Sequence, residues 1–287
     1  MSTAPVLVVG ATGNVGRHVV KHLLGSGRRV RALARDPGEA AALLGPDVEI
    51  VQGDLELPAS LAPALEGVEV ASFATAATPD LGRQEVNFID AASAAGVRRL
   101  VKQSGAGVGV LKGAISAAHG ESERRLHASG IPAVLVKPAT LMSNLLGNAE
   151  AIRSGSLPSV FGDGRVSFVD PRDVGELIAR AVIDPQYDGQ ALRFGGPAAL
   201  TYDEVAAILS DALGRSIAHV RIDVPAFQAS AAGRGLPAHV IDTIVEAASL
   251  APSGTFIASD DAIQQILGRP ASPLRDWVDR NREALAA

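Results

Sequence analysis

Three glycines near the amino terminus have the spacing of a nucleotide-binding turn. The apolar run 6–9 leads directly into Gly10, and Gly13 and Gly16 follow at intervals of three residues. Such glycines allow, in turn, a tight exit from a strand, the approach of a phosphate to the backbone and close packing of a helix on a sheet. The N–H groups and the dipole of the following helix favour a pyrophosphate. The pattern predicts dinucleotide binding; the alternative is an ordinary strand-to-helix turn of an α/β protein.

A cation follows the second expected strand, residues 29–34. The residue just past this strand faces the adenosine ribose in dinucleotide-binding folds, where an acid binds the 2′-hydroxyl of NAD and an arginine favours the 2′-phosphate of NADP. Arg35 occupies that position, and Asp36 comes one residue later. Contacts between arginine and phosphate are charge-assisted and often bidentate. We therefore expect NADP(H) as the cofactor, with a solvated loop charge as the alternative role of Arg35.

The composition argues against several other kinds of chemistry. The chain of 287 residues has no cysteine, which excludes disulfides, thiolate catalysis and cysteine-ligated metals. Its six histidines are scattered, with no two at ligand spacing beside a carboxylate, so we expect no metal. The glycines around Ser104 lack the G-x-S-x-G pattern of a serine hydrolase.

Charge and hydropathy bear on location and partners. A net charge of −5 gives no electrostatic reason to expect a nucleic-acid partner. No apolar run approaches the roughly 20 residues that span a bilayer. The amino terminus enters the first strand without the basic segment and apolar core of a signal peptide. We expect a cytoplasmic monomer or homodimer that has no nucleic-acid or membrane partner.

Alternating strands and helices must position the candidate residues. Short apolar runs and amphipathic stretches alternate up to residue 141, which demands an α/β fold with a parallel, doubly wound sheet. The expected strands are 6–9, 29–34, 48–52, 68–73, 99–103 and 133–137. Helices are expected between them, with four of them at 37–44, 57–65, 82–95 and 119–130.

The rhythm changes beyond residue 141. We expect a Gly- and Pro-rich loop at 152–163, helices over 226–251 and a capping box formed by Thr201 and Glu204. Trp277 should anchor the last helix. The expected division is a dinucleotide-binding domain (1–141 plus about 165–186), a small C-terminal α/β substrate lobe (about 142–164 and 187–270) and a C-terminal helix (271–287).

Two motifs resemble a known superfamily. The sequence GATGNVG at 10–16 resembles the extended and atypical short-chain dehydrogenase/reductases, which have a Rossmann-like fold. The pattern H-x-E-x-E-x-x-L-x-x-S-G at 119–130 resembles their NmrA-like branch, which includes quinone reductases and NADP-sensing regulators. The resemblance covers nearly the whole chain. The cofactor-binding positions that it and the glycine turn imply are Gly10, Thr12, Gly13, Asn14, Val15, Arg35, Asp54, Leu55, Ala74, Thr75, Ser104, His119, Pro138, Ala139 and Thr140.

The chain departs from the superfamily at its catalytic pair. His119 occupies the place of the lysine in the superfamily's Tyr-x-x-x-Lys pair, and Ile115 stands where the tyrosine would be. The two tyrosines of the chain, Tyr187 and Tyr202, lie far downstream. The usual proton donor is therefore missing.

The resemblance also implies roles for polar residues near this pair. Ser104 should hydrogen-bond the substrate carbonyl, with Gln103 as its rival, so Ser104 and His119 are the catalytic candidates. In the superfamily, an Arg-Pro signature at the end of the sixth strand lies beside the nicotinamide of the cofactor, and Lys137 stands here in place of that arginine. Glu123 is expected to have a structural role. Asn87 either braces the fourth or fifth strand or lies on the surface.

Three functions remain open without the tyrosine. The first is an NADP(H)-dependent reductase that transfers hydride to a quinone, or to a ketone of an aromatic, polyketide-like substrate. The product oxygen is then phenolic, with a pKa of roughly 10, and needs little help from a protein acid. The second is a non-catalytic NADP(H) sensor of the NmrA type, and the third is an epimerase or dehydratase of nucleotide sugars. We favour the reductase, with His119 binding the cofactor ribose as a neutral ring rather than acting as the main acid.

Overall fold

The computed structural model describes residues 4–286. These residues form two compact units: unit 1 comprises the chain up to Gly109, Ile115–Lys137 and Val174–Leu192, and unit 2 comprises Val110–Ala114, Pro138–Asp173 and the chain from Arg193 onward. The functional division expected above, into a cofactor domain and a substrate lobe, stays a prediction. Within the described range, no helix is both long and apolar enough to cross a membrane.

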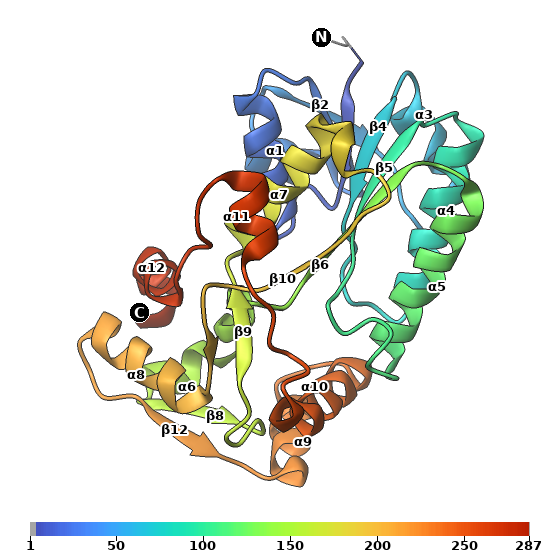
Figure 1. The fold of residues 1–287 in the computed structure, drawn as a ribbon. Helices are drawn as coiled ribbons and strands as arrows, with labels where there is room; N and C mark the ends of the chain where they lie inside the picture. The colour runs from blue at the N-terminus through green and yellow to red at the C-terminus, as the bar shows by residue number, and fades with distance from the viewer. Residues whose placement is uncertain (1–3, 287) are drawn as a thin grey trace. The chain divides into compact units, whose positions relative to one another are not determined.

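Unit 1 is built on a seven-stranded sheet with the order β10-β6-β5-β4-β1-β2-β3 (Figure 1). Strand β1 pairs in parallel with β2 on one side and β4 on the other, so that Val6 lies opposite Val30 and Val70. The strand order reverses beside β1, and ligands of such sheets bind at the carboxyl ends of the strands near that reversal. This confirms the doubly wound fold. The strands are β1 Val6–Val9, β2 Val30–Ala34, β3 Val48–Gln52, β4 Val70–Phe73, β5 Arg99–Gln103, β6 Ala133–Pro138 and β10 Ala191–Phe194.

Helices cover both faces of this sheet. Figure 1 shows α1 (Gly16–Gly25) and α7 (Pro171–Ile183) on one face, and α4 (Leu81–Ala94) and α5 (Ala114–Ser129) on the other. Two glycines allow the helices of each pair to approach closely. A Cβ on Gly175 would lie 2.5 Å from the Cβ of His18, and a Cβ on Gly82 would lie 3.2 Å from the Cβ of Ala118. The remaining short elements of unit 1 are α2 Pro37–Leu44, η1 Pro58–Ser60, α3 Ala62–Leu65 and η3 Pro185–Tyr187.

The inner stripe of α4 is apolar except at one position. Leu81, Phe88, Ile89 and Ala92 recur at helical spacing and are buried. The ring of Phe88 packs on Phe73 of β4, with centroids 5.1 Å apart. Full burial of such a side chain contributes about 1.5–3 kcal/mol. Glu85 lies on the same stripe, and its side chain is wholly inaccessible to solvent.

Unit 2 contains two small sheets and a set of short helices. The sheets are β11-β9-β7 and β12-β8. Trp277 is 3% exposed and packs with Tyr202 in the core of this unit, which confirms the anchor role expected for it. The capping box of Thr201 and Glu204 is also present. The elements are β7 Thr140–Leu141, η2 Met142–Asn148, α6 Ala149–Arg153, β8 Ser156–Ser159, β9 Val166–Val169, β11 Ala199–Leu200, α8 Tyr202–Leu213, β12 Ala218–Arg221, α9 Val224–Gly233, α10 Ala238–Leu250, η4 Ala251–Ser253, α11 Asp261–Leu267, α12 Leu274–Arg280 and α13 Arg282–Ala286.

Four expected elements differ in the structure. The helix expected at 57–65 is a 3-10 turn followed by the single turn α3, because Pro63 interrupts a helix that begins at Pro58. Helix α5 begins at Ala114, five residues before the expected start. The loop expected at 152–163 contains β8, which pairs in parallel with β12 some sixty residues away, with Ser156 opposite Ala218. The single helix expected at 271–287 is two helices, α12 and α13; residue 287 lies outside the described range.

Candidate functional site

The three glycines at the end of β1 meet different demands. Gly10 has φ +77°, and a Cβ on it would lie 2.1 Å from the carbonyl oxygen of Ala74, so only glycine fits there. A Cβ on Gly16 would lie 2.0 Å from the carbonyl oxygen of Gly10. Gly13 is exposed, its N–H donates to the Gly10 carbonyl at 3.0 Å, and a Cβ there would lie 3.2 Å from that oxygen, a tight contact that a small shift relieves. Thus Gly10 and Gly16 are required by the turn itself, whereas Gly13 faces the ligand side.

The loop between Gly10 and α1 offers unused donors. Thr12 and Asn14 are exposed, and within the described range the backbone N–H groups of Thr12, Asn14 and Val15 have no protein acceptor. Val15, the N-cap residue of α1, supplies no side-chain acceptor either. Free N–H groups at the positive end of a helix fit a pyrophosphate. The loop therefore suits the group that the glycine spacing predicts.

The loops after β2 and β3 present the next expected cofactor residues. Arg35 is exposed, and its guanidinium makes no ion pair with any described residue. The neighbouring carboxylate of Asp36 caps α2 by accepting the N–H of Glu39 at 3.0 Å, and no ion pair joins it to Arg35 in the described range. Asp54 accepts the N–H of Glu56 at 2.9 Å in a local turn. These contacts leave the cation of Arg35 available to an anion.

Asn87 has a role different from either alternative considered for it. Its Nδ2 donates to the carbonyl oxygen of Leu55 at 2.8 Å, so that α4 holds the loop after β3. Asn87 therefore braces this loop, and not β4 or β5. The contact holds the backbone of Leu55, one of the expected cofactor-binding positions.

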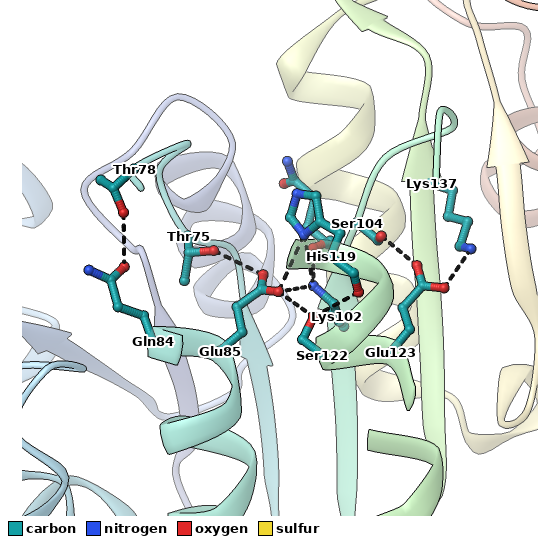
Figure 2. A network of polar contacts seen from close by, with 11 residues as sticks. Thr75, Thr78, Gln84, Glu85, Lys102, Ser104, His119, Ser122, Glu123 and Lys137 are labelled. Atoms are coloured by element: carbon teal, nitrogen blue, oxygen red, sulfur yellow. Dashed lines mark hydrogen bonds and ion pairs between the residues drawn. The ribbon is translucent and has the colours of Figure 1, made fainter. Parts of the chain in front are cut away.

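A buried polar network lies at the carboxyl ends of β4 and β5 (Figure 2). Lys102 Nζ contacts Glu85 Oε2 at 2.6 Å, and both side chains are wholly inaccessible. Ser122 Oγ donates to Glu85 Oε2 at 2.5 Å and Thr75 Oγ1 donates to Oε1 at 2.9 Å. His119 Nδ1 lies 3.2 Å from Lys102 Nζ and 3.3 Å from Glu85 Oε2. Thr75 and His119, two expected cofactor residues, thus contact the same carboxylate.

Charge stabilises the carboxylate form of Glu85. Burial alone would raise the pKa of Glu85, but its contacts with His119 and the charge of Lys102 outweigh burial and lower the pKa to about 2. Burial lowers the pKa of Lys102, and the attraction of Glu85 opposes that shift. The pair is therefore strongly coupled and depends on both partners.

A second polar chain surrounds Ser104. Its hydroxyl donates to Glu123 Oε1 at 2.5 Å, and Glu123 Oε2 accepts from Lys137 Nζ at 2.8 Å (Figure 2). An ionised carboxylate only accepts hydrogen bonds, so the hydroxyl hydrogen of Ser104 is engaged with Glu123. Gln103, the rival of Ser104, has a buried Oε1 with no partner among the described residues. Gln103 therefore offers an acceptor that a ligand N–H or O–H could use.

The two tyrosines of the chain lie in different units. Tyr187 precedes β10, next to Gly189, whose N–H donates to the carbonyl of Ala133 at the start of β6. This is the opposite, amino edge of the sheet. Tyr202 is buried in the core of unit 2 and stacks on Phe161, and burial raises its pKa. The structure thus agrees with a site that does not rely on a tyrosine.

The last three expected cofactor residues continue the chain beyond Lys137. Pro138 ends β6 and is buried. Ala139 donates its N–H to the carbonyl of Phe194 at 2.8 Å, and Thr140 begins β7. All three belong to unit 2, and their part in cofactor binding stays a prediction.

Unit 2 holds a second histidine cluster that resembles a hydrolytic triad in its order of contacts. His219 Nε2 lies 2.9 Å from Ser159 Oγ, and its Nδ1 lies 3.0 Å from Asp203 Oδ1. The side chain of His219 is only 1% exposed and Ser159 is only 5% exposed. The contacts of this cluster join β8, β12 and α8 structurally. Among the described residues there is also no group of three or more potential metal ligands.

Comparisons with known proteins identify the family. The family model for NAD(P)H-binding proteins matches residues 10–185. The chain belongs to the NAD(P)H-binding family. It is 37% identical to (4-alkanoyl-5-oxo-2,5-dihydrofuran-3-yl)methyl phosphate reductase of Streptomyces griseus and 34% identical to NAD(P)H azoreductase of Xenophilus azovorans, in each case with 98% of this chain and 99% of the relative covered.

A solved structure of a similar protein contains the cofactor. NADPH-dependent quinone oxidoreductase 2 of Escherichia coli, crystallised with NADPH, superposes with a TM-score of 0.87 at 25% identity, covering 96% of this chain and 99% of that one. These relatives confirm the expected membership of the NmrA-like, atypical short-chain dehydrogenase/reductases and the NAD(P)H cofactor.

For this NAD(P)H-binding protein, we predict that Arg35 selects NADPH. The Arg35→Asp variant should bind NADPH on the order of 10-fold to 100-fold more weakly, since a hydrogen bond to a charged group contributes about 1.5–3 kcal/mol. NADH affinity should change little, because NADH has no 2′-phosphate. Isothermal titration calorimetry with both cofactors measures this difference. Equal losses for the two cofactors would show that Arg35 only supports the loop.

Sequence reasoning missed the Glu85–Lys102 pair, although both residues left a signal. Lys102 interrupts the apolar core of the fifth strand, and Glu85 falls on the apolar stripe of α4 together with Ile89. Charged residues are almost never fully buried unless they are paired. Two opposite charges at expected core positions of neighbouring elements therefore indicate an ion pair.

Proposed function

We propose that this protein is an NADPH-dependent reductase that transfers hydride to a quinone or to a ketone of an aromatic, polyketide-like substrate. The observation that carries the proposal is the carboxyl edge of the main sheet in unit 1. That edge combines a dinucleotide turn with the polar groups of Gln103 and His119, whereas Tyr187 lies at the opposite edge of the sheet and Tyr202 is buried in the core of unit 2. The family supports an NAD(P)H-dependent oxidoreductase, and the names of its relatives support a quinone, dye or carbonyl compound as substrate.

The missing tyrosine limits the substrates that fit. Hydride addition to an ordinary ketone produces a strongly basic alkoxide, which needs a proton donor with a suitable pKa. Addition to a quinone produces a phenolate, whose conjugate acid has a pKa of roughly 10, so water can protonate it. A ketone that is hydrogen-bonded to its own neighbouring phenol has a similar internal donor. Substrates of these two kinds are therefore favoured over simple ketones.

The residues of the chain suit binding and orientation of the cofactor. NADPH, when bound, supplies the hydride. The N–H groups of Thr12, Asn14 and Val15 would bind its pyrophosphate and Arg35 its 2′-phosphate. Gln103 Oε1 would accept a hydrogen bond from the ligand, which would satisfy a buried atom that otherwise has no partner. Cytoplasmic location and a monomeric or dimeric state stay predictions.

A steady-state assay tests the function. NADPH oxidation is followed with a panel of quinones, hydroxylated aromatic ketones and simple aliphatic ketones. We expect turnover with the first two classes and little with the third. Tight NADPH binding in calorimetry without turnover of any panel member would contradict the reductase and favour a sensor.

We predict that His119 binds the cofactor and is not the main acid. The His119→Gln variant should raise the KM for NADPH, while kcat falls by less than about 10-fold, because general acid catalysis typically contributes about 10²–10⁴. Steady-state kinetics with a quinone measures both parameters. The Tyr187→Phe and Tyr202→Phe variants are the matched controls and should keep most activity. A loss of three orders of magnitude in kcat for His119→Gln with NADPH still bound would make His119 the proton donor.

A further inference from the structure

The ammonium group of Lys102 has one acceptor for each of its hydrogens. Its Nζ contacts Glu85 Oε2 at 2.6 Å, the carbonyl oxygen of Gln103 at 3.2 Å and His119 Nδ1 at 3.2 Å. A lysine ammonium has three N–H donors and no acceptor. The side chain is wholly inaccessible, so water cannot replace any of these partners. In this arrangement His119 Nδ1 accepts and therefore carries no hydrogen.

The alternative arrangement leaves a buried charged donor without a partner. If Nδ1 carried the hydrogen, it would donate to Glu85 Oε2 at 3.3 Å and its N–H would point toward an N–H of Lys102. Glu85 Oε2 already accepts from Lys102 and Ser122, and Oε1 accepts from Thr75. A hydrogen bond from Nδ1 would also stabilise the Glu85 carboxylate, but it would leave an N–H of the buried Lys102 ammonium without a partner, which is costly.

We propose that Lys102 and Glu85 are positioning residues that hold His119 as the neutral Nε2–H tautomer. A neutral imidazole has one N–H, so an acceptor at Nδ1 places a donor at Nε2. Lys102 supplies the hydrogen bond to Nδ1, and Glu85 balances the buried charge of Lys102. His119 then offers a hydrogen-bond donor at the end of β5.

The ligand group that fits this donor is an oxygen that accepts a hydrogen bond. Within the described range His119 Nε2 has no protein partner, and 13% of the side chain is exposed. The hydroxyl hydrogen of Ser104, the other catalytic candidate, already points to Glu123. Of the two catalytic candidates, Ser104 and His119, only His119 therefore has a hydrogen-bond donor, its Nε2–H, that is still available to a ligand. This inference rests on the proposed function and deepens it, since the acceptor would be a ribose hydroxyl of NADPH or the carbonyl of its acceptor substrate.

Nitrogen NMR of the free protein tests the tautomer without any assay of activity. The protein is labelled with ¹⁵N-histidine and studied at a pH well above the ordinary histidine pKa of about 6.5. The His119→Gln variant identifies the His119 signals by their loss. We expect the proton on Nε2 alone. A proton on Nδ1, or comparable populations of both tautomers, would overturn the proposal even if the protein reduces quinones.

Variants of the pair test the cause. In Lys102→Met the Nδ1–H form should become dominant, because Glu85 Oε2 at 3.3 Å is then the nearest polar partner of Nδ1. In Glu85→Leu/Lys102→Met, which removes both charges, both tautomers should appear. Lys137→Met is the matched control, because Lys137 pairs with Glu123 at 2.8 Å and should leave the His119 tautomer unchanged. Pure Nε2–H in either variant that lacks Lys102 would show that Lys102 does not hold it.

Two titrations of the wild-type protein identify the ligand oxygen. Adding NADP⁺ alone should shift the Nε2–H signal if the acceptor is a ribose hydroxyl, whereas adding a quinone to the NADP⁺ complex should shift it if the acceptor is the substrate. No shift in either titration would show that Nε2 does not contact a ligand and would overturn its donor role. If the protein shows the Nε2–H tautomer but oxidises no NADPH in the assay, only the proposed function is contradicted, and the tautomer proposal stands.

Discussion

The Gly13→Val variant is expected to lose measurable NADPH binding while it keeps its fold. Gly13 is exposed beside the free N–H groups of the loop, so a branched side chain there would occupy the space of the pyrophosphate or push the backbone away from it. The fold should survive, since the first added carbon meets only the Gly10 carbonyl oxygen, at 3.2 Å. Calorimetry with NADPH and far-ultraviolet circular dichroism measure the two properties.

Two further glycine variants serve as controls for this result. Gly25→Val, at the other end of α1, should bind NADPH normally, because nothing lies within 4 Å of a Cβ there. Gly16→Val should damage the fold itself, since its Cβ would lie 2.0 Å from the Gly10 carbonyl oxygen. Unchanged NADPH affinity in Gly13→Val would remove the basis for a dinucleotide site at this turn.

Loss of Glu85 is expected to cause the largest fall in stability. Glu85→Leu leaves the ammonium of Lys102 buried without its counter-charge, and removal of one partner from a buried pair costs about 3–5 kcal/mol. Glu85→Leu/Lys102→Met should recover most of this loss, because apolar residues of similar volume often replace a buried ion pair without net cost. Urea denaturation followed by circular dichroism measures the free energy of unfolding of each. A single variant as stable as the wild type would show that the pair is not tightly coupled.

Lowering the pH should show how much the Glu85–Lys102 pair contributes to the stability of the wild-type protein. The pKa of Glu85 is lowered from 4.5 to about 2 in the folded protein, so its contribution is fully present above pH 4.5 and is lost as the pH falls toward about 2. A shift of this size corresponds to about 3 kcal/mol, at about 1.36 kcal/mol per pKa unit. The double variant lacks Glu85 and should lose less stability over the same pH range. A wild-type protein with the same acid dependence as the double variant would contradict this role of Glu85.

The main sheet could be predicted from local patterns, and unit 2 only in part. Strands β1 to β6 are short apolar runs, and helix α4 has a clear period, so both are visible in the sequence. Strand β8 contains Pro158 and follows Gly155, which indicates a loop locally. It forms a strand because β12 supplies its hydrogen-bond partners from a distant part of the chain. In 57–65 the local signal is present in the sequence, since Pro63 interrupts a helix that begins at Pro58.

The sequence by itself determined the dinucleotide turn, the doubly wound fold, the family and the absence of the catalytic tyrosine. Each of these depends on residue types at short spacings, because a turn, a strand or a helix is specified by its own residues. Only the tertiary structure decided what the polar side chains do. In the folded protein the hydroxyl of Ser104 donates to Glu123, and Lys102 contacts both His119 and its buried ion-pair partner Glu85. Such contacts join different elements, and their geometry depends on how helices pack on the sheet, which no single stretch of sequence specifies.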